Sequence, residues 1–135
     1  MSEPQDAIAR IQVIAKTLPG LAEAPEYPPE SINQFPFSLA YLNRGETTFE
    51  AGWRKDIWTI FWEIYVARQI LARDIAKAMS YAQPALAALH ADPTLGGTVS
   101  TIVSPVTCTF GWLEYGSQDN KLLGWRFAVT VKQET

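Results

Sequence analysis

The side chains best suited to catalysis are few in this chain. Its only histidine, His90, lies two residues before Asp92, and its only cysteine, Cys108, is distant in sequence. A histidine beside a carboxylate could act as a general base or supply two metal ligands, but a nucleophilic triad or a common zinc site needs further partners. His90 ends a stretch of alanines and leucines, where a histidine typically caps backbone carbonyls or lies at the surface. We therefore predict no catalytic residue and no metal site.

The cysteine and the carboxylates offer little more. Cys108 lies in a strand-like run, which favours a small buried apolar role over a reactive thiol. Acid–base chemistry needs paired carboxylates, which would require Glu46 to meet Glu50, or Glu63 to meet Asp56, across a hairpin. Carboxylates in hairpins are usually solvated, and no neighbour in the sequence indicates a raised pKa. We therefore expect a protein that is not an enzyme.

Two adjacent glycines, Gly96 and Gly97, follow a predicted helix and precede a predicted strand. A phosphate-binding loop has the opposite order, from strand through glycines to a helix N-terminus, and continues into Lys-Ser or Lys-Thr. The pair therefore predicts a turn, and we expect no cofactor.

Length and composition are typical of one domain, residues 1–135, with a mass of 15.0 kDa. The 47% hydrophobic content supports a core, and no run reaches the roughly 20 apolar residues of a spanning helix. The acidic start lacks the features of a signal peptide, and a single cysteine excludes an internal disulfide framework, so we expect a cytoplasmic, non-membrane protein. A net charge of −3 without a basic cluster argues against tight nucleic-acid binding.

The first half of the chain reads as a helix followed by strands. Apolar residues at helical spacing predict a helix over residues 3–17, and the proline-rich residues 21–35 predict a loop. Strands are predicted over residues 36–43 and 47–53, joined by a turn at Asn43-Arg44-Gly45-Glu46. A third strand, residues 55–67, is apolar on both faces, which is typical of a covered central strand. Its odd member, Glu63, should lie near an edge or meet a basic partner.

The second half of the chain also reads as a helix followed by strands. A second helix is predicted over residues 68–91, with a kink or a division into two helices at Pro84. Three strands follow at residues 99–104, 106–115 and 123–132. The order α-β-β-β-α-β-β-β predicts an α+β fold with two principal helices and a mainly antiparallel sheet.

Five tryptophans in 135 residues are an unusual number. Strand periodicity predicts that Trp58 or Trp62, together with Trp125, belongs to the core. Trp53 and Trp112 lie near predicted strand ends, so we expect them at an interface with a partner.

Three phrases carry a resemblance over nearly the whole chain: "PEYPPESINQFPFSLAYL", "ADPTLGGTVSTI" after a long helix, and "LGWRFAVTVKQ" in the last strand. With the order of elements, they resemble the small tail-terminator, or tail-completion, proteins of long-tailed bacteriophages and prophages. Leu95, Gly96 and Gly97 match the turn phrase, which implies an architectural role.

The resemblance implies a structural protein of the virion tail, assembled in the host cytoplasm. Such proteins form a homo-oligomeric ring, commonly a hexamer, that caps the tail tube protein and presents a surface to the head connector protein. DNA passes through the central channel, and the acidic balance suits passage without gripping. No motif marks the contact residues. Because loops at the end of a sheet are free to meet partners, we expect contacts at the two hairpin tips: Arg44, Gly45, Glu46, Ser117, Gln118, Asp119, Asn120 and Lys121.

Two other interpretations stay open. The chain could be another phage head–tail connector or adaptor that oligomerises but docks elsewhere. It could also be a small ligand-binding α+β domain whose tryptophan-rich strands form the walls of a pocket.

Overall fold

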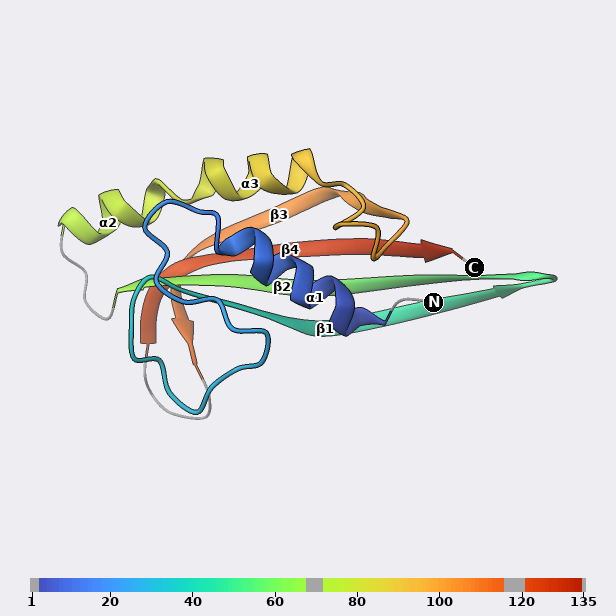
Figure 1. Cartoon of the computed structure of the whole chain (residues 1–135), viewed down its shortest axis with the longest axis horizontal. Coiled ribbons are helices and arrows are strands. Elements are labelled where there is room, and N and C mark those ends of the chain that lie inside the picture. Colours follow the sequence, from blue (N-terminus) through green and yellow to red (C-terminus); the bar gives the residue numbers. More distant parts are fainter. Residues whose placement is uncertain (1–2, 68–71, 116–120, 135) are drawn as a thin grey trace.

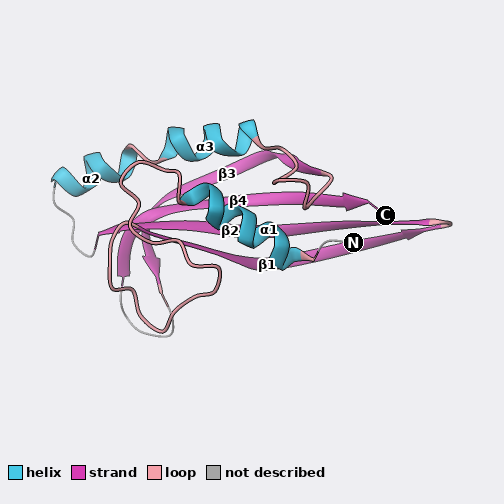
Figure 2. Cartoon of the chain, in the orientation of Figure 1, coloured by secondary structure: helices cyan, strands magenta, loops and turns pink. Residues whose placement is uncertain are grey.

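The computed structural model describes residues 3–67, 72–115 and 121–134. Four antiparallel strands form one sheet in the order β1-β2-β4-β3, and helices pack on one of its faces (Figures 1 and 2). The predicted α+β class with an antiparallel sheet is therefore confirmed, as is the alternation of helical and strand segments. The elements are α1 (Pro4–Ala15), β1 (Phe37–Glu50), β2 (Trp53–Ala67), α2 (Ala72–Met79), α3 (Ala82–Ala91), β3 (Thr101–Glu114) and β4 (Lys121–Glu134).

Helix α1 begins and ends close to the predicted positions. Pro4 occupies the first turn, where no intrahelical N–H bond is lost. The backbone N–H of Glu3 donates to Asp6 Oδ2 at 2.8 Å, so the first turn is closed by a side chain. Ile8 and Ile11 are buried against the sheet. The apolar spacing that predicted this helix therefore also identifies its buried face.

The first predicted turn is wrong. Arg44, Gly45 and Glu46 lie inside β1, which continues to Glu50 with an irregularity between Leu42 and Arg44. The two predicted strands at residues 36–43 and 47–53 are thus largely one strand, and the chain reverses at residues 51–52. Gly45 is opposite Trp58 in the register, and a Cβ at position 45 would lie 2.9 Å from Trp58 Cδ1. This glycine makes room for an indole ring and is not a turn residue.

The second principal helix is divided into two helices, which is one of the two predicted outcomes. Helix α2 ends at Met79 and α3 begins at Ala82, so the break precedes Pro84 by a few residues. Pro84 lies in the first turn of α3, where a missing N–H costs little. The predicted beginning of this helix, residues 68–71, is outside the described residues.

The predicted strands 99–104 and 106–115 are also one strand, β3. The register of β3 against β4 shifts between Val103 and Thr107, around Pro105. Proline cannot donate to a ladder, and β3 is an edge strand of the sheet, where such an interruption is tolerated. Before this strand, Leu95, Gly96 and Gly97 form a turn in which all three residues have positive φ.

The main core lies between the helices and one face of the sheet. Trp62 is completely buried there, with its ring centroid 5.3 Å from that of Phe127 and the two rings tilted by 41°, while Trp58 and Trp125 are half-buried against this core. The opposite face carries a smaller cluster that includes Phe37 and Tyr65. Central strand β2 is therefore apolar on both faces, as its sequence predicted.

A buried polar cluster ties α1 to the sheet. Ser38 Oγ donates to Gln12 Oε1 at 2.7 Å and accepts from Trp62 Nε1 at 2.8 Å. Gln12 Nε2 also donates to the backbone carbonyl of Ser38 at 2.9 Å. Both Ser38 and Trp62 are 0% exposed, so water cannot replace these contacts.

Replacing Ser38 by alanine is expected to lower the free energy of unfolding by about 2 kcal/mol, because it takes away the hydroxyl that serves the buried Trp62 N–H and Gln12 oxygen. Chemical denaturation measures this loss. Ser80→Ala is the matched control, since the Ser80 hydroxyl bonds a helix carbonyl at an exposed position. Equal stabilities of the two variants would contradict the role given to Ser38.

Glu63 meets a basic partner, as predicted. Its Oε2 accepts from Arg126 Nε at 2.6 Å, across the β2–β4 register, and from the Tyr41 hydroxyl at 3.1 Å. The Tyr65 hydroxyl donates to its Oε1. Burial, followed by the charge of Glu63, raises the pKa of Tyr41 to about 12, so this hydroxyl stays a donor at neutral pH. The same causes raise the pKa of Tyr65.

Candidate functional site

The residues that could carry out catalysis do not converge. His90 is exposed at the end of α3. Asp92 instead accepts from Arg10 Nε at 2.8 Å and from the backbone N–H of Gly96 at 2.9 Å. The Gly96 contact is the leading cause that lowers the pKa of the Asp92 carboxyl. Asp92 therefore fixes the turn that follows α3.

The remaining candidates have separate structural partners. Cys108 is half-buried against the main core, and burial raises the pKa of its thiol. Asp56 accepts from Thr47 Oγ1 at 2.6 Å and pairs with Arg54, whereas Glu63 pairs with Arg126. Across the described ranges, no three histidine, cysteine or acidic side chains are grouped in a way that could hold a metal ion. These side chains do not define a reactive centre.

The most distinctive feature is the end of the β1–β2 hairpin, residues 42–57, which we call the hairpin arm. In Figure 1 the arm extends beyond the helices and beyond the end of β4. Every residue from Leu42 to Trp53 is exposed. The register explains the extension, because β4 ends at Glu134, opposite Lys55, so the last residues of the arm have no neighbour on the β4 side. Arg44 and Glu46 lie along this arm and pair with each other at 3.1 Å.

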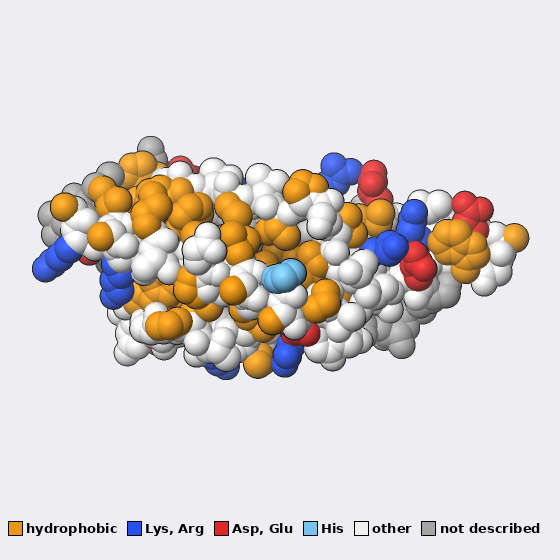
Figure 3. Space-filling view, turned by 90° about the horizontal axis from the view of Figure 1, so that it is seen from above, with side chains coloured by type: hydrophobic (Ala, Val, Ile, Leu, Met, Phe, Trp, Pro, Cys, Tyr) orange, Lys and Arg blue, Asp and Glu red, His pale blue; other side chains and the backbone are white. Residues whose placement is uncertain are grey.

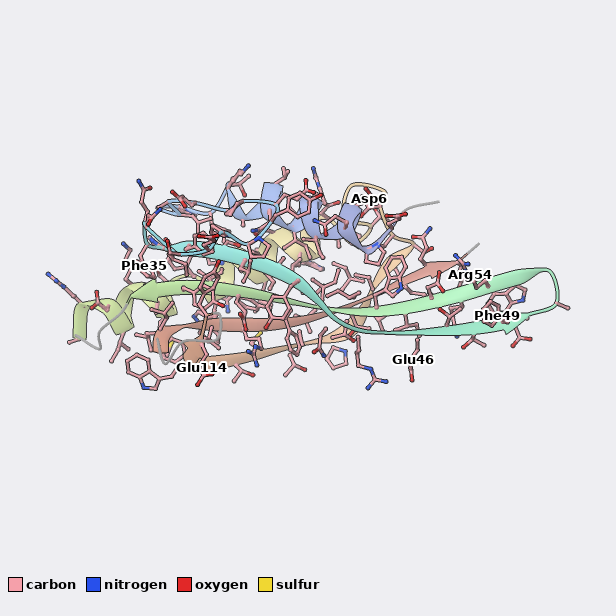
Figure 4. The ribbon with its side chains drawn as sticks, turned by 90° about the horizontal axis from the view of Figure 1, so that it is seen from below. Asp6, Phe35, Glu46, Phe49, Arg54 and Glu114 are labelled. Carbon is pink, nitrogen blue, oxygen red and sulfur yellow. The ribbon has the colours of Figure 1, made fainter. Side chains whose placement is uncertain are left out.

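The tip of the arm exposes two aromatic side chains. Phe49 is 77% exposed and Trp53 is 44% exposed. Figure 4 shows Phe49 and Arg54 near the end of the hairpin, away from the core. Trp53 is exposed, and its expected place at an interface stays a prediction, whereas sequence reasoning missed Phe49. The strand predicted over residues 47–53 includes Phe49, and only the position of the turn at residues 51–52 shows that this strand end is not covered.

The opposite end of the sheet exposes a second apolar group. Trp112, 47% exposed, pairs with Leu123, which in turn pairs with Ala67 at the far end of β2. Helix α2 lies at this end (Figure 1) and exposes Ile75 and Met79. Figure 3 shows apolar side chains gathered over the α2 end and again at the hairpin tip. Both ends of the molecule therefore expose apolar side chains, whose contact with water is unfavourable.

The second predicted contact loop falls largely outside the described residues. Ser117, Gln118, Asp119 and Asn120 belong to residues 116–120, which the structure does not describe, and Lys121 is the first residue of β4. Their expected role at an interface stays a prediction. So does the role of Trp53 and Trp112, whose exposure alone identifies no partner.

Comparison with known proteins adds no family. No family model matches the chain, and no curated protein matches it either. Within the described ranges, none of the helices has the length and apolar character needed to cross a bilayer.

Proposed function

We propose that this chain is a structural phage tail terminator, which assembles into a ring of six copies, caps the tail tube and forms the interface to the head connector. The observation that carries the proposal is the hairpin arm with its exposed Phe49 and Trp53. An extended arm with aromatic side chains at its tip is suited to reach a neighbouring subunit and bury apolar area there.

The positions of the apolar groups support a ring. The tip of the arm and Trp112 lie at opposite ends of the same sheet, so a contact between them joins two copies head to tail. Such heterologous contacts generate a closed ring when the rotation between copies closes, and a filament when it does not. The sequence resemblance to tail terminators favours closure at six.

The charge of the chain fits the proposed place in the particle. A net charge of −3 disfavours a tight grip on phosphates, so DNA would pass through the channel without specific binding. The protein would act in the virion tail after assembly in the host cytoplasm. A connector or adaptor elsewhere in the particle would share the ring but would not cap tail tubes.

The wild-type chain is expected to form a species of about six times 15.0 kDa, measured by light scattering after size exclusion. The double variant F49S/W53S and the single variant W112S should each weaken self-association by more than about tenfold while leaving the fold intact. Val13→Ser is the matched control, because Val13 is 49% exposed on α1, outside both end surfaces.

Mixing the variants sharpens this test. F49S/W53S keeps the end that carries Trp112, and W112S keeps the arm tip, so an equimolar mixture should yield a dimer through the single intact contact. If F49S/W53S and W112S both assembled as the wild type does, the arm would not form part of the interface. A wild-type chain that stays monomeric and also fails to stop the growth of purified tail tubes would overturn the terminator function itself.

A further inference from the structure

A pocket of about 420 Å³ opens on the face of the sheet that the helices leave free. Its walls come from the loop before β1, from β1 and β2, and from the end of β3. The side chains that decide its chemistry are Glu30, Tyr41, Glu63, Tyr65, Glu114 and Tyr115. Figure 4 shows Glu114 on the side of the sheet away from α1. Of the catalytic candidates discussed above only Glu63 lines this pocket, and the hairpin tip does not belong to it.

Aromatic rings form much of the wall. Tyr65 and Tyr115 meet edge to face, with ring centroids 5.9 Å apart, and Tyr115 donates its hydroxyl to the backbone carbonyl of Pro29. The Tyr41 and Tyr65 hydroxyls are engaged by Glu63. Since these hydroxyls point at a buried carboxylate, the rings are held in fixed positions. Tyr65 is 1% exposed, so the ring surface open to a ligand belongs to the half-buried Tyr41 and Tyr115, and such fixed π faces attract a cation that lies over them.

The charge of the pocket is negative. At its base the charge of Glu63 is balanced by Arg126, whose Nε lies 2.6 Å from Oε2. Glu30 and Glu114 also line the pocket, both exposed, and none of its described lining residues is basic. Over the described part of the chain the acidic side chains do not group as metal ligands. The pocket therefore matches a cation larger than a metal ion.

We propose that this pocket binds the guanidinium group of an arginine side chain presented by a protein partner. A guanidinium is planar, so it stacks on tyrosine rings, and it presents N–H donors that carboxylates accept. The volume lies in the lower part of the range for ligand pockets, enough for a whole side chain. This inference does not depend on the proposed ring, because the pocket and the end surfaces share no residue.

The test uses the full chain labelled with 3-fluorotyrosine and titrated with N-acetyl-arginine amide under ¹⁹F NMR. Three labelled tyrosines line the pocket, whereas Tyr27 and Tyr81 lie outside it and serve as internal references. We expect saturable shifts at Tyr41, Tyr65 and Tyr115, with a dissociation constant of about 1 mM for so small a probe. Shifts of equal size at all five tyrosines would overturn the proposal, as would no saturable shift up to ten times that concentration.

Two controls isolate the charge. N-acetyl-citrulline amide has nearly the same shape without the charge, and it should cause no saturable shift. Glu114→Gln should weaken arginine binding at least about threefold, the effect of one partly exposed ion pair. Glu50→Gln removes a carboxylate at the arm tip and should leave the affinity unchanged. Equal binding of citrulline, or equal affinities of the two variants with unaltered melting temperatures, would overturn the proposal.

Discussion

Replacing Gly124 by alanine is expected to remove more than about 3 kcal/mol of stability, or to prevent soluble expression altogether. Gly124 lies in β4 opposite Tyr65, and a Cβ at this position would be 2.1 Å from the backbone oxygen of Ile64. Backbone atoms of a central strand cannot turn aside as a flexible side chain can. The added methyl group must therefore force β2 and β4 apart, which breaks the ladder at the centre of the sheet.

Gly111→Ala is the matched control for this prediction. Gly111 pairs with Gly124 across β3 and β4, and a Cβ there would meet nothing within 4 Å, although its φ of 154° favours glycine. Gly111→Ala should lower the free energy of unfolding by only about 1 kcal/mol, the cost of an unfavourable backbone conformation. Denaturant unfolding of both variants decides the matter. If Gly124→Ala is no less stable than Gly111→Ala, the close approach of the strands does not govern this position.

Arg126→Met is expected to lower the free energy of unfolding by about 3 kcal/mol, because it leaves the Glu63 carboxylate buried without its cation. Glu63 is 1% exposed, so water cannot take the place of the guanidinium. The packing over the Phe61 ring, 4.8 Å from the guanidinium carbon, is also disturbed, although methionine retains part of that contact. The loss therefore reports mainly the uncompensated charge.

The double variant E63Q/R126M tests this assignment. With both charges gone, stability should recover by more than about 1 kcal/mol relative to Arg126→Met alone, which a double-mutant cycle measures. Lys132→Met is the matched control, since Lys132 pairs on the same strand with Glu134 at 3.2 Å and the Glu134 side chain is 51% exposed. Its cost should stay below about 1 kcal/mol. An Arg126→Met variant as stable as Lys132→Met would show that Glu63 needs no cation.

Both positions also connect the fold to the pocket. Gly124 allows β4 to lie close to β2 at Tyr65, and Arg126, two residues further, then reaches Glu63 across the register. Glu63 in turn holds the hydroxyls of Tyr41 and Tyr65, which form the pocket wall. The positions of the pocket tyrosines, on which arginine recognition would depend, therefore rely on the close strand packing that Gly124 allows.

The sequence by itself determined the fold class, the helix over α1 and the antiparallel sheet. These follow from local periodicity, since the spacing of apolar residues fixes which side of an element must be buried. The same periodicity indicated that Glu63 was out of place in β2 and that an edge or a basic residue would have to explain it.

Only the tertiary structure decided where β1 turns and which charge meets Glu63. The segment Asn43-Arg44-Gly45-Glu46 has the composition of a turn, yet it lies in a strand. Gly45 is accommodated there because the side chain of Trp58, thirteen positions away, occupies the space that a Cβ would need. Arg126 is paired with Glu63 by the β2–β4 register, and the pocket gathers residues from position 28 to position 115. Contacts between residues so far apart in sequence depend on how the strands align, and that alignment is set by the turns and by which face is buried, not by either segment alone.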